Sequence, residues 1–202
     1  MALGADFQDT NQGGVMRIML VLPAVALCAT TLSAQEPRRG PAAEIRPFAG
    51  AFIPLGAQRS DFKSATMVGA QAAVELNRHV HGVASVGWTH GHNKFFTEDL
   101  THIWQYDVGT EFNLVREIGY GWCFRPFTGT GAGGRTYNYR GVAARTTTCV
   151  AGYGTVGSEL QHNVVAFRIE ARDYLSCYKP PTAEKRTRND LGLTFGLAYH
   201  IR

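Results

Sequence analysis

Leu191–Ile201 (LGLTFGLAYHI) alternates without a break between large apolar side chains and small or polar ones. The same alternation runs through residues 104–114, 68–76, 84–89 and 165–172. Because successive side chains of a β-strand point to opposite faces, each stretch predicts a strand with one apolar and one polar face. Three weaker segments, 44–53, 122–137 and 147–160, bring the expected number of strands to eight. The last two are rich in glycine, and the pattern leaves open which of their faces is which.

The connections between these segments alternate in length. Asn77–His79, Arg116–Gly121 and Gln161–Asn163 are short. The longer, polar ones are Pro54–Ser64, Gly91–Thr101, Asn138–Arg145 and Tyr178–Asn189. Short turns at one end and longer loops at the other are typical of β-barrels that span the bacterial outer membrane. With an even number of strands, both ends of the barrel segment fall at the short-turn end.

The beginning of the chain has the pattern of an export signal. Arg17 precedes the apolar run Ile18–Ala29, and small residues follow up to Ala34. This order of charged, apolar and small residues is typical of a secretory signal, and the run is too short for a membrane-spanning helix. We expect residues 1–34 to be extension and signal, with translation starting at Met16 and cleavage before Gln35. No later segment is continuously apolar over the ~20 residues that a transmembrane helix needs.

Composition argues for one folded domain, residues 35–202. Apolar residues make up 45% of the chain and charged residues 18%, with no break in composition that would divide it. The net charge is +4 and the basic residues are scattered. Because nucleic-acid binding needs clustered positive charge, nucleic acid is not an expected partner.

Alternation alone does not say which face lies inside the barrel. A soluble ligand-binding barrel of the lipocalin type buries its apolar face, whereas a transmembrane barrel turns that face to lipid. Here the polar faces are rich in Gly, Ala, Ser and Thr, which suits a narrow lumen. Aromatic residues such as Trp88, Trp104 and Tyr199 lie near strand ends on the apolar face, where interfacial girdles belong. We therefore expect an all-β, eight-stranded antiparallel up-and-down transmembrane β-barrel.

Two stretches carry a resemblance to a known family. Pro47–Pro54 (PFAGAFIP) opens the barrel, and the last strand has Gly196, Tyr199 and Ile201 at the spacing of a C-terminal recognition strand. The mature chain thereby resembles the small OmpA-like outer-membrane barrels. The resemblance implies an outer-membrane location and recognition of these three residues by the barrel-assembly machinery. Ile201 stands where the family usually has Phe, and Arg202 follows it.

The polar faces carry charges of both signs, which we expect to pair inside the lumen. They are Glu75, Asp107, Glu111, Arg168, Glu170 and Arg172. Arg125 and Arg135 join them if the odd positions of 122–137 point inward. An eight-stranded barrel is just wide enough to be filled by side chains, and a buried charge there must be paired. We interpret the set as a structural salt-bridge plug; the alternative is a gated ion path.

Neither catalysis nor a cofactor is predicted. Lipid A deacylases of similar fold carry a His and a Ser two residues apart on one strand, and this chain has no His-x-Ser. His162 and Ser158 are four residues apart near a turn. His90 and His92, with His102 across the loop, could hold a metal, but loop histidines are commonly solvated, and we predict no metal site. The apolar pair Phe95-Phe96 suggests a contact with lipopolysaccharide or a partner.

Cys149 and Cys177 are predicted to form a disulfide, with Cys123 left over. Export leads to an oxidising compartment, where cysteine pairs are used structurally. A tight turn at His162-Asn163 would place the two cysteines opposite each other to within one residue, inside the range of a disulfide. The alternative is two reduced cysteines that only pack.

The sequence therefore favours a non-enzymatic outer-membrane barrel, monomeric, with a structural or adhesive role carried by four long loops. Its expected partners are outer-membrane lipids, lipopolysaccharide and the barrel-assembly machinery. The main alternative is a narrow channel or transport barrel. A soluble lipocalin-like binder and a lipid A-modifying enzyme are the remaining alternatives.

Overall fold

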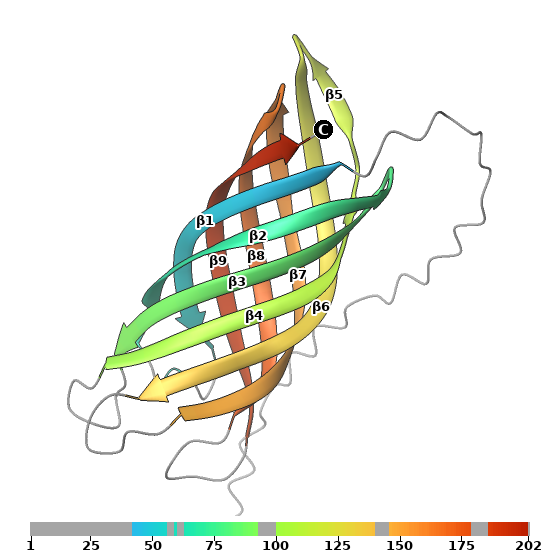
Figure 1. The fold of residues 1–202 in the computed structure, drawn as a ribbon. Helices are drawn as coiled ribbons and strands as arrows, with labels where there is room; N and C mark the ends of the chain where they lie inside the picture. The colour runs from blue at the N-terminus through green and yellow to red at the C-terminus, as the bar shows by residue number, and fades with distance from the viewer. Residues whose placement is uncertain are drawn as a thin grey trace, which may run out of the picture. The chain divides into compact units, whose positions relative to one another are not determined.

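The computed structural model describes residues 42–55, 59, 63–92, 100–139, 146–178 and 186–201. Almost all of them belong to β-strands. In chain order these are β1 (Ala43–Pro54), β2 (Ala65–Asn77), β3 (Val80–His92), β4 (Leu100–Asn113), β5 (Arg116–Gly119), β6 (Trp122–Tyr139), β7 (Thr146–His162), β8 (Val165–Tyr178) and β9 (Arg186–Ile201). Figure 1 shows them winding obliquely around a common interior.

The strands close into a barrel. Neighbours in the chain, β4 and β5 excepted, pair antiparallel. β9 returns to pair with β1, so that Glu44 lies opposite His200 and Phe52 opposite Gly192. β4 pairs directly with β6 along its whole length, while the short β5 pairs only with the beginning of β6. Since β5 merely continues β4, the closed barrel has eight strands. The predicted fold class is confirmed.

The two ends of the barrel differ, as the alternating connections predict. Residues 78–79, 120–121 and 163–164 form two-residue turns at the end where β1 begins and β9 stops, which we call the turn end. Tyr120 and Asn163 have φ of 53° and 56°, the left-handed conformation that tight hairpin turns need. The short turn lies at 120–121 and not over the whole of Arg116–Gly121, because 116–119 pair as β5.

The opposite end, the loop end, has the connections 55–64, 93–99, 140–145 and 179–185. They are shorter than the sequence predicts because the strands extend further: β3 runs to His92, β6 to Tyr139 and β8 to Tyr178, while β4 begins at Leu100 and β9 at Arg186. β1 adds one residue, Pro54. Most residues of these connections, Phe95 and Phe96 among them, lie outside the part of the chain that the structure describes.

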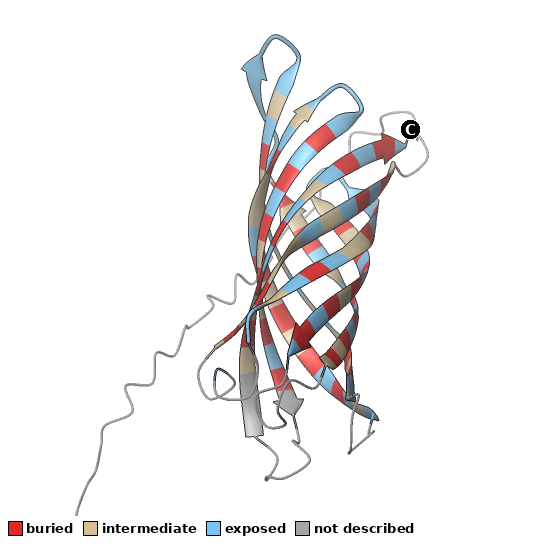
Figure 2. Cartoon of the chain, turned by 90° about the vertical axis from the view of Figure 1, so that its left-hand side faces the viewer, coloured by how far each residue is buried: buried red, intermediate tan, exposed pale blue. Residues whose placement is uncertain are grey.

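The two faces of the barrel wall are inverted relative to a water-soluble protein. Figure 2 shows buried and exposed residues alternating along the strands. Large apolar side chains lie outside: Val108 is 65% exposed and Ile169 45%. Charged side chains lie inside: Glu111 is 2% exposed and Arg168 3%. Charged residues are almost never fully buried in a soluble domain unless they are paired. The wall is therefore that of a transmembrane barrel and not of a lipocalin-like one.

The structure also settles the orientation of the two glycine-rich strands. In both β6 and β7 the odd-numbered positions point inward. Arg125 and Arg135 of β6 are buried, and so are Thr155 and Glu159 of β7. Both arginines consequently lie in the lumen.

The predicted Cys149–Cys177 disulfide is not seen in the structure, and the β7–β8 register differs from the one assumed. Ala151 pairs with Ser176, and continuing this register places position 178, not Cys177, opposite Cys149. Cys149 is buried. A shift of one residue moves a side chain to the other face of a sheet. The structure has no disulfide at Cys149 or at Cys123.

The expectations for the start of the chain lie outside the described residues. These are the signal segment 1–34, its cleavage after Ala34 and the start at Met16. In the ranges that are described, no helix combines the length and the apolar character needed to cross a membrane.

Candidate functional site

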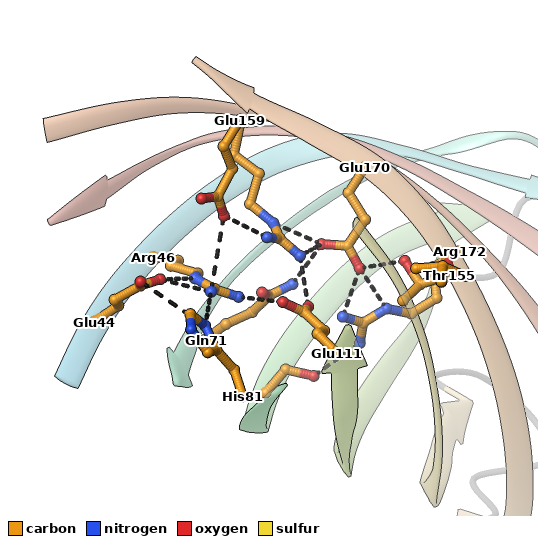
Figure 3. Close-up of polar contacts among 12 residues, drawn as sticks. Glu44, Arg46, Gln71, His81, Glu111, Thr155, Glu159, Glu170 and Arg172 are labelled. Carbon is orange, nitrogen blue, oxygen red and sulfur yellow. Dashed lines mark hydrogen bonds and ion pairs between the residues drawn. The ribbon is translucent and has the colours of Figure 1, made fainter. Parts of the chain in front are cut away.

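The lumen contains a network of ion pairs that begins at the turn end with Arg46 of β1 (Figure 3). Its guanidinium donates to Glu44 Oε2 over 2.5 and 2.8 Å and to Glu111 Oε2 over 2.8 Å. Arg125 of β6 lies 3.4 Å from Glu44 Oε1 and 3.6 Å from Glu159 Oε2. Strands β1, β4, β6 and β7 are thereby connected across the interior.

Arg168 of β8 is the centre of the network. Its Nη1 atom donates to Glu159 over 2.5 Å, and its Nη2 atom donates to Glu111 over 2.6 Å and to Glu170 over 3.1 Å. The guanidinium carbon also lies 3.6 Å from the centre of the Phe127 ring. Charge-assisted bonds of this kind are roughly twice as strong as neutral ones. One arginine thus satisfies three buried carboxylates.

Arg172 continues the network toward the loop end. Its Nη2 atom lies 2.6 Å from Glu170, and its Nη1 atom donates to Asp107 over 3.2 Å. Ser85 and Tyr174 also donate to the same Asp107 oxygen, over 3.3 and 2.9 Å. The Asp107 carboxylate is therefore fixed by donors from β3 and β8.

The loop end of the lumen is closed by a last ion pair and an apolar cluster. Arg135 pairs with Asp190, and its guanidinium carbon lies 3.9 Å from the centre of the Tyr174 ring and 5.4 Å from that of Phe52. The buried apolar cluster around this pair consists of Phe52, Met67, Ile103, Tyr137 and Cys149. These side chains fill the last described layer of the lumen.

Buried negative charge exceeds buried arginine by one among the described residues. The buried carboxylates are Glu44, Asp107, Glu111, Glu159, Glu170 and Asp190, and the buried arginines are Arg46, Arg125, Arg135, Arg168 and Arg172, so six face five. His200 Nδ1 lies 2.9 Å from Glu44 Oε1.

Glu44, Glu159 and His200 also have the composition of a metal site. One donor atom from each lies within 4.8 Å of the others, and all three are buried. However, the Arg46 and Arg125 guanidinium groups already contact both glutamates, over distances of 2.5 to 3.7 Å. A metal ion would have to share this space with two permanent cations. The arrangement fits an ion-paired cluster better than a metal centre.

Five of the six charges that the sequence places in the lumen are brought together there, and Glu75 is not. Asp107, Glu111, Arg168, Glu170 and Arg172 are buried and share hydrogen bonds. Glu75 has the inward phase of β2, yet it is exposed, because it lies only two residues from the end of the strand at Asn77. Its carboxylate lies at the rim of the turn end.

Several lumen residues are absent from that sequence-based set: Glu44, Arg46, His81, Glu159, Asp190 and His200. Glu44 and Arg46 alternate with Ile45 and Pro47, so the period of two was present at the start of β1. Glu159 is missing from the set because the sequence does not show which face of β7 points into the lumen. His200 lies on the polar face of its strand, but the set contains only carboxylates and arginines, so no histidine is included in it.

The residues of the other two interpreted motifs lie on the outside of the barrel, except Gly196, which has the inward phase of β9. Tyr199 and Ile201 are exposed on the outer face of β9, while Gly196 lies against β1, where an added Cβ would come 2.6 Å from the Pro47 carbonyl oxygen. His162 is exposed beside the Trp122 ring at the turn end, and Ser158 has the outward phase of β7. This His–Ser pair faces away from every lumen carboxylate named above.

No family model and no curated protein matches the chain. Solved structures do match. Neisserial surface protein A aligns with a TM-score of 0.60 and 12% identity over 78% of this chain and 97% of that one. The N-terminal barrel domain of Pseudomonas aeruginosa OprF aligns with a TM-score of 0.53 and 12% identity, over 79% of this chain and 97% of that one. The outer membrane protein OprG from Pseudomonas aeruginosa aligns with a TM-score of 0.51 and 13% identity, over 81% of this chain and 96% of that one. The chain therefore has the fold of the small eight-stranded outer-membrane β-barrels that its sequence resembles.

Proposed function

We propose that this protein spans the bacterial outer membrane as a closed, non-conducting barrel and acts through its loops at the cell surface. The inverted wall is the observation that carries the proposal. Phe195, Leu197 and Tyr199 are each 54% exposed outside, while ion-paired Arg and Glu fill the interior. Such a surface is stable against lipid and would aggregate in water.

The proposed location includes export by the N-terminal signal, with the mature chain starting at Gln35. A basic residue, an apolar run and small residues in this order support it. Fractionation of membranes, combined with gel mobility before and after heating, tests the location. Mass spectrometry of the outer-membrane form tests the cleavage, and a retained 1–34 segment would contradict it.

The lumen supports a closed barrel rather than a pore. Arg46, Arg168 and Arg172 each bind carboxylates from other strands, and the apolar cluster around Phe52 and Tyr137 covers the loop end. An ion crossing this lumen would have to break several buried ion pairs, each costing roughly 3–5 kcal/mol when one partner is removed. With a closed lumen, we expect the protein to have a structural or adhesive role. The loop-end connections 55–64, 93–99, 140–145 and 179–185 would carry it.

A narrow channel is the second candidate, favoured by polar side chains at both ends of the lumen, Asn113 at the turn end and Thr101 at the loop end. Single-channel recording in planar bilayers separates the two functions. We expect no reproducible openings from the folded barrel, with an open porin reconstituted in parallel as positive control. Reproducible openings of one amplitude would establish the channel and overturn the closed barrel.

We further propose that the protein is non-enzymatic and that its partners are membrane lipids, lipopolysaccharide and the barrel-assembly machinery. No His-x-Ser motif is present, and His162 and Ser158 lie outside the lumen network. Incubation of the folded barrel with lipopolysaccharide, followed by mass spectrometry of lipid A, tests this proposal. Loss or gain of an acyl chain would make the protein an enzyme.

A further inference from the structure

Three histidines lie together on the outer surface of the barrel at the loop end. His90 and His92 are the last outward-facing residues of β3, and His102 is near the start of β4. The register pairs His90 directly with His102. His90 and His92 are exposed and His102 is half-buried. These three, which we call the histidine cluster, take no part in the lumen network.

The spacing of one pair of imidazole rings matches that of rings sharing one metal ion, while the nitrogens of all three rings do not yet lie within 4.8 Å of one another. The centroids of His90 and His102 are 5.0 Å apart, and those of His90 and His92 are 6.2 Å apart. In a tetrahedral zinc site each ring nitrogen lies about 2.1 Å from the metal, which places two ring centroids roughly 5 Å apart. The 5.0 Å pair already has this separation. Exposed side chains change rotamer within nanoseconds, so His92 can close the remaining difference.

The position of the cluster leaves His90 and His92 accessible to ions, whereas both ring nitrogens of His102 are buried, so that ring must turn to bind one. Trp88 of β3 lies opposite Trp104 of β4. This outward-facing pair is the next one toward the middle of the barrel from His90 and His102, and it lies at the edge of the apolar surface. His90 and His102 follow two residues further along each strand, about 7 Å beyond the tryptophans. Interfacial tryptophans mark the level of the lipid head groups, so the histidines lie on the aqueous side of that level.

The neighbourhood also orients one of the ligands. The His102 ring is stacked on Trp88, with centroids 5.6 Å apart and an interplanar angle of 16°. This contact holds His102 beside the more mobile His90. A ligand ring fixed by its neighbour loses less conformational entropy when it binds a metal.

From this arrangement we propose that His90 and His102, with His92 as third donor, bind a divalent transition metal at the outer surface. Imidazole nitrogens suit Cu²⁺, Ni²⁺ and Zn²⁺, with Cu²⁺ bound most tightly. The site differs from the Glu44–Glu159–His200 group in the lumen, where two arginines already neutralise the carboxylates. It does not depend on whether the lumen conducts.

The test is a titration of the untagged, folded mature chain with Cu²⁺ and with Zn²⁺, followed by calorimetry and, for Cu²⁺, by electron paramagnetic resonance. We expect one ion per chain, with nitrogen hyperfine splitting in the copper spectrum. His90→Gln should weaken binding at least tenfold, because His90 is close to both other rings.

His162→Gln is the matched control, since His162 is exposed and next to a tryptophan, Trp122, at the opposite end. It should leave binding unchanged. Heat-modifiable gel mobility confirms that both variants are folded. Equal affinity and stoichiometry in His90→Gln and the unsubstituted chain would overturn the proposal, as would equal losses in the two variants.

Discussion

His200 and Glu44 face each other across the seam where the last strand pairs with the first, with His200 Nδ1 2.9 Å from Glu44 Oε1. The same carboxylate accepts hydrogen bonds from Arg46 and Arg125. Glu44 therefore connects the seam to the network in the lumen. Because the seam joins the two ends of the barrel segment, its polar contacts form only when the whole barrel has closed.

The first prediction concerns this carboxylate. Glu44→Gln leaves Arg46 and Arg125 with one buried partner fewer, and we expect the free energy of unfolding to fall by roughly 3–5 kcal/mol. Glu75→Gln is the control, because Glu75 is exposed, and it should change stability by no more than about 0.5 kcal/mol. Urea unfolding of the barrel in lipid vesicles measures both. Equal effects of the two substitutions would contradict the buried network.

The second prediction concerns the outer face. Val108 lies midway along β4 and is 65% exposed, so Val108→Arg places a charge against the lipid core. We expect a loss of roughly 2–4 kcal/mol, because the cost of a charge on the lipid face is largest at the bilayer centre. Leu76→Arg makes the same chemical change next to the 78–79 turn and should cost about 0–1 kcal/mol. Without a difference between the two sites, the apolar surface would not be facing lipid.

The fold could be predicted from the sequence because a strand repeats every two residues and that period survives any tertiary context. Leu191–Ile201 shows this, since each of its apolar residues lies outside and each small or polar one inside. The pattern failed where glycine replaces one class of side chain. In β6, Gly129, Gly131 and Gly133 occupy inward positions without marking them as polar or apolar.

The candidate site was only partly predictable, because alternation gives the face of a residue but neither its depth nor its partners. Glu75 and Gln71 share a phase on β2, yet Gln71 is buried and Glu75 is exposed at the rim. Arg46 and Glu111 are 65 positions apart and meet only across the closed lumen. Such pairs depend on barrel closure and on the register of every strand between them.

The third prediction follows from the register of β7 and β8. Since Ala151 pairs with Ser176, Cys149 and Cys177 are not directly opposed. Cys149 packs in the apolar cluster with Phe52 and Tyr137. Alkylation of the unfolded, unreduced mature chain should therefore modify three thiols, those of Cys123, Cys149 and Cys177. A Cys149–Cys177 linked peptide in a map made without reduction would show that the register or the strand end differs.

The last prediction concerns a glycine that makes room for the central arginine. A Cβ atom on Gly157 would lie 2.3 Å from Phe127 Cζ and 2.3 Å from the Ile169 carbonyl oxygen. Phe127 in turn carries the Arg168 guanidinium, 3.6 Å from its ring centre. Gly157→Ala must therefore displace the ring, and overpacking of this kind costs roughly 1–3 kcal/mol.

Gly152→Ala on the same strand is its matched control. The nearest atom to a Cβ there is the Gly131 carbonyl oxygen at 3.9 Å, so the added methyl group meets no obstacle. Alanine should be neutral at this position or more stable by up to about 1 kcal/mol, because glycine loses more backbone entropy on folding. Urea unfolding in vesicles, followed by tryptophan fluorescence, compares the two variants. If Gly157→Ala were as stable as Gly152→Ala, Phe127 would not be holding Arg168 in place.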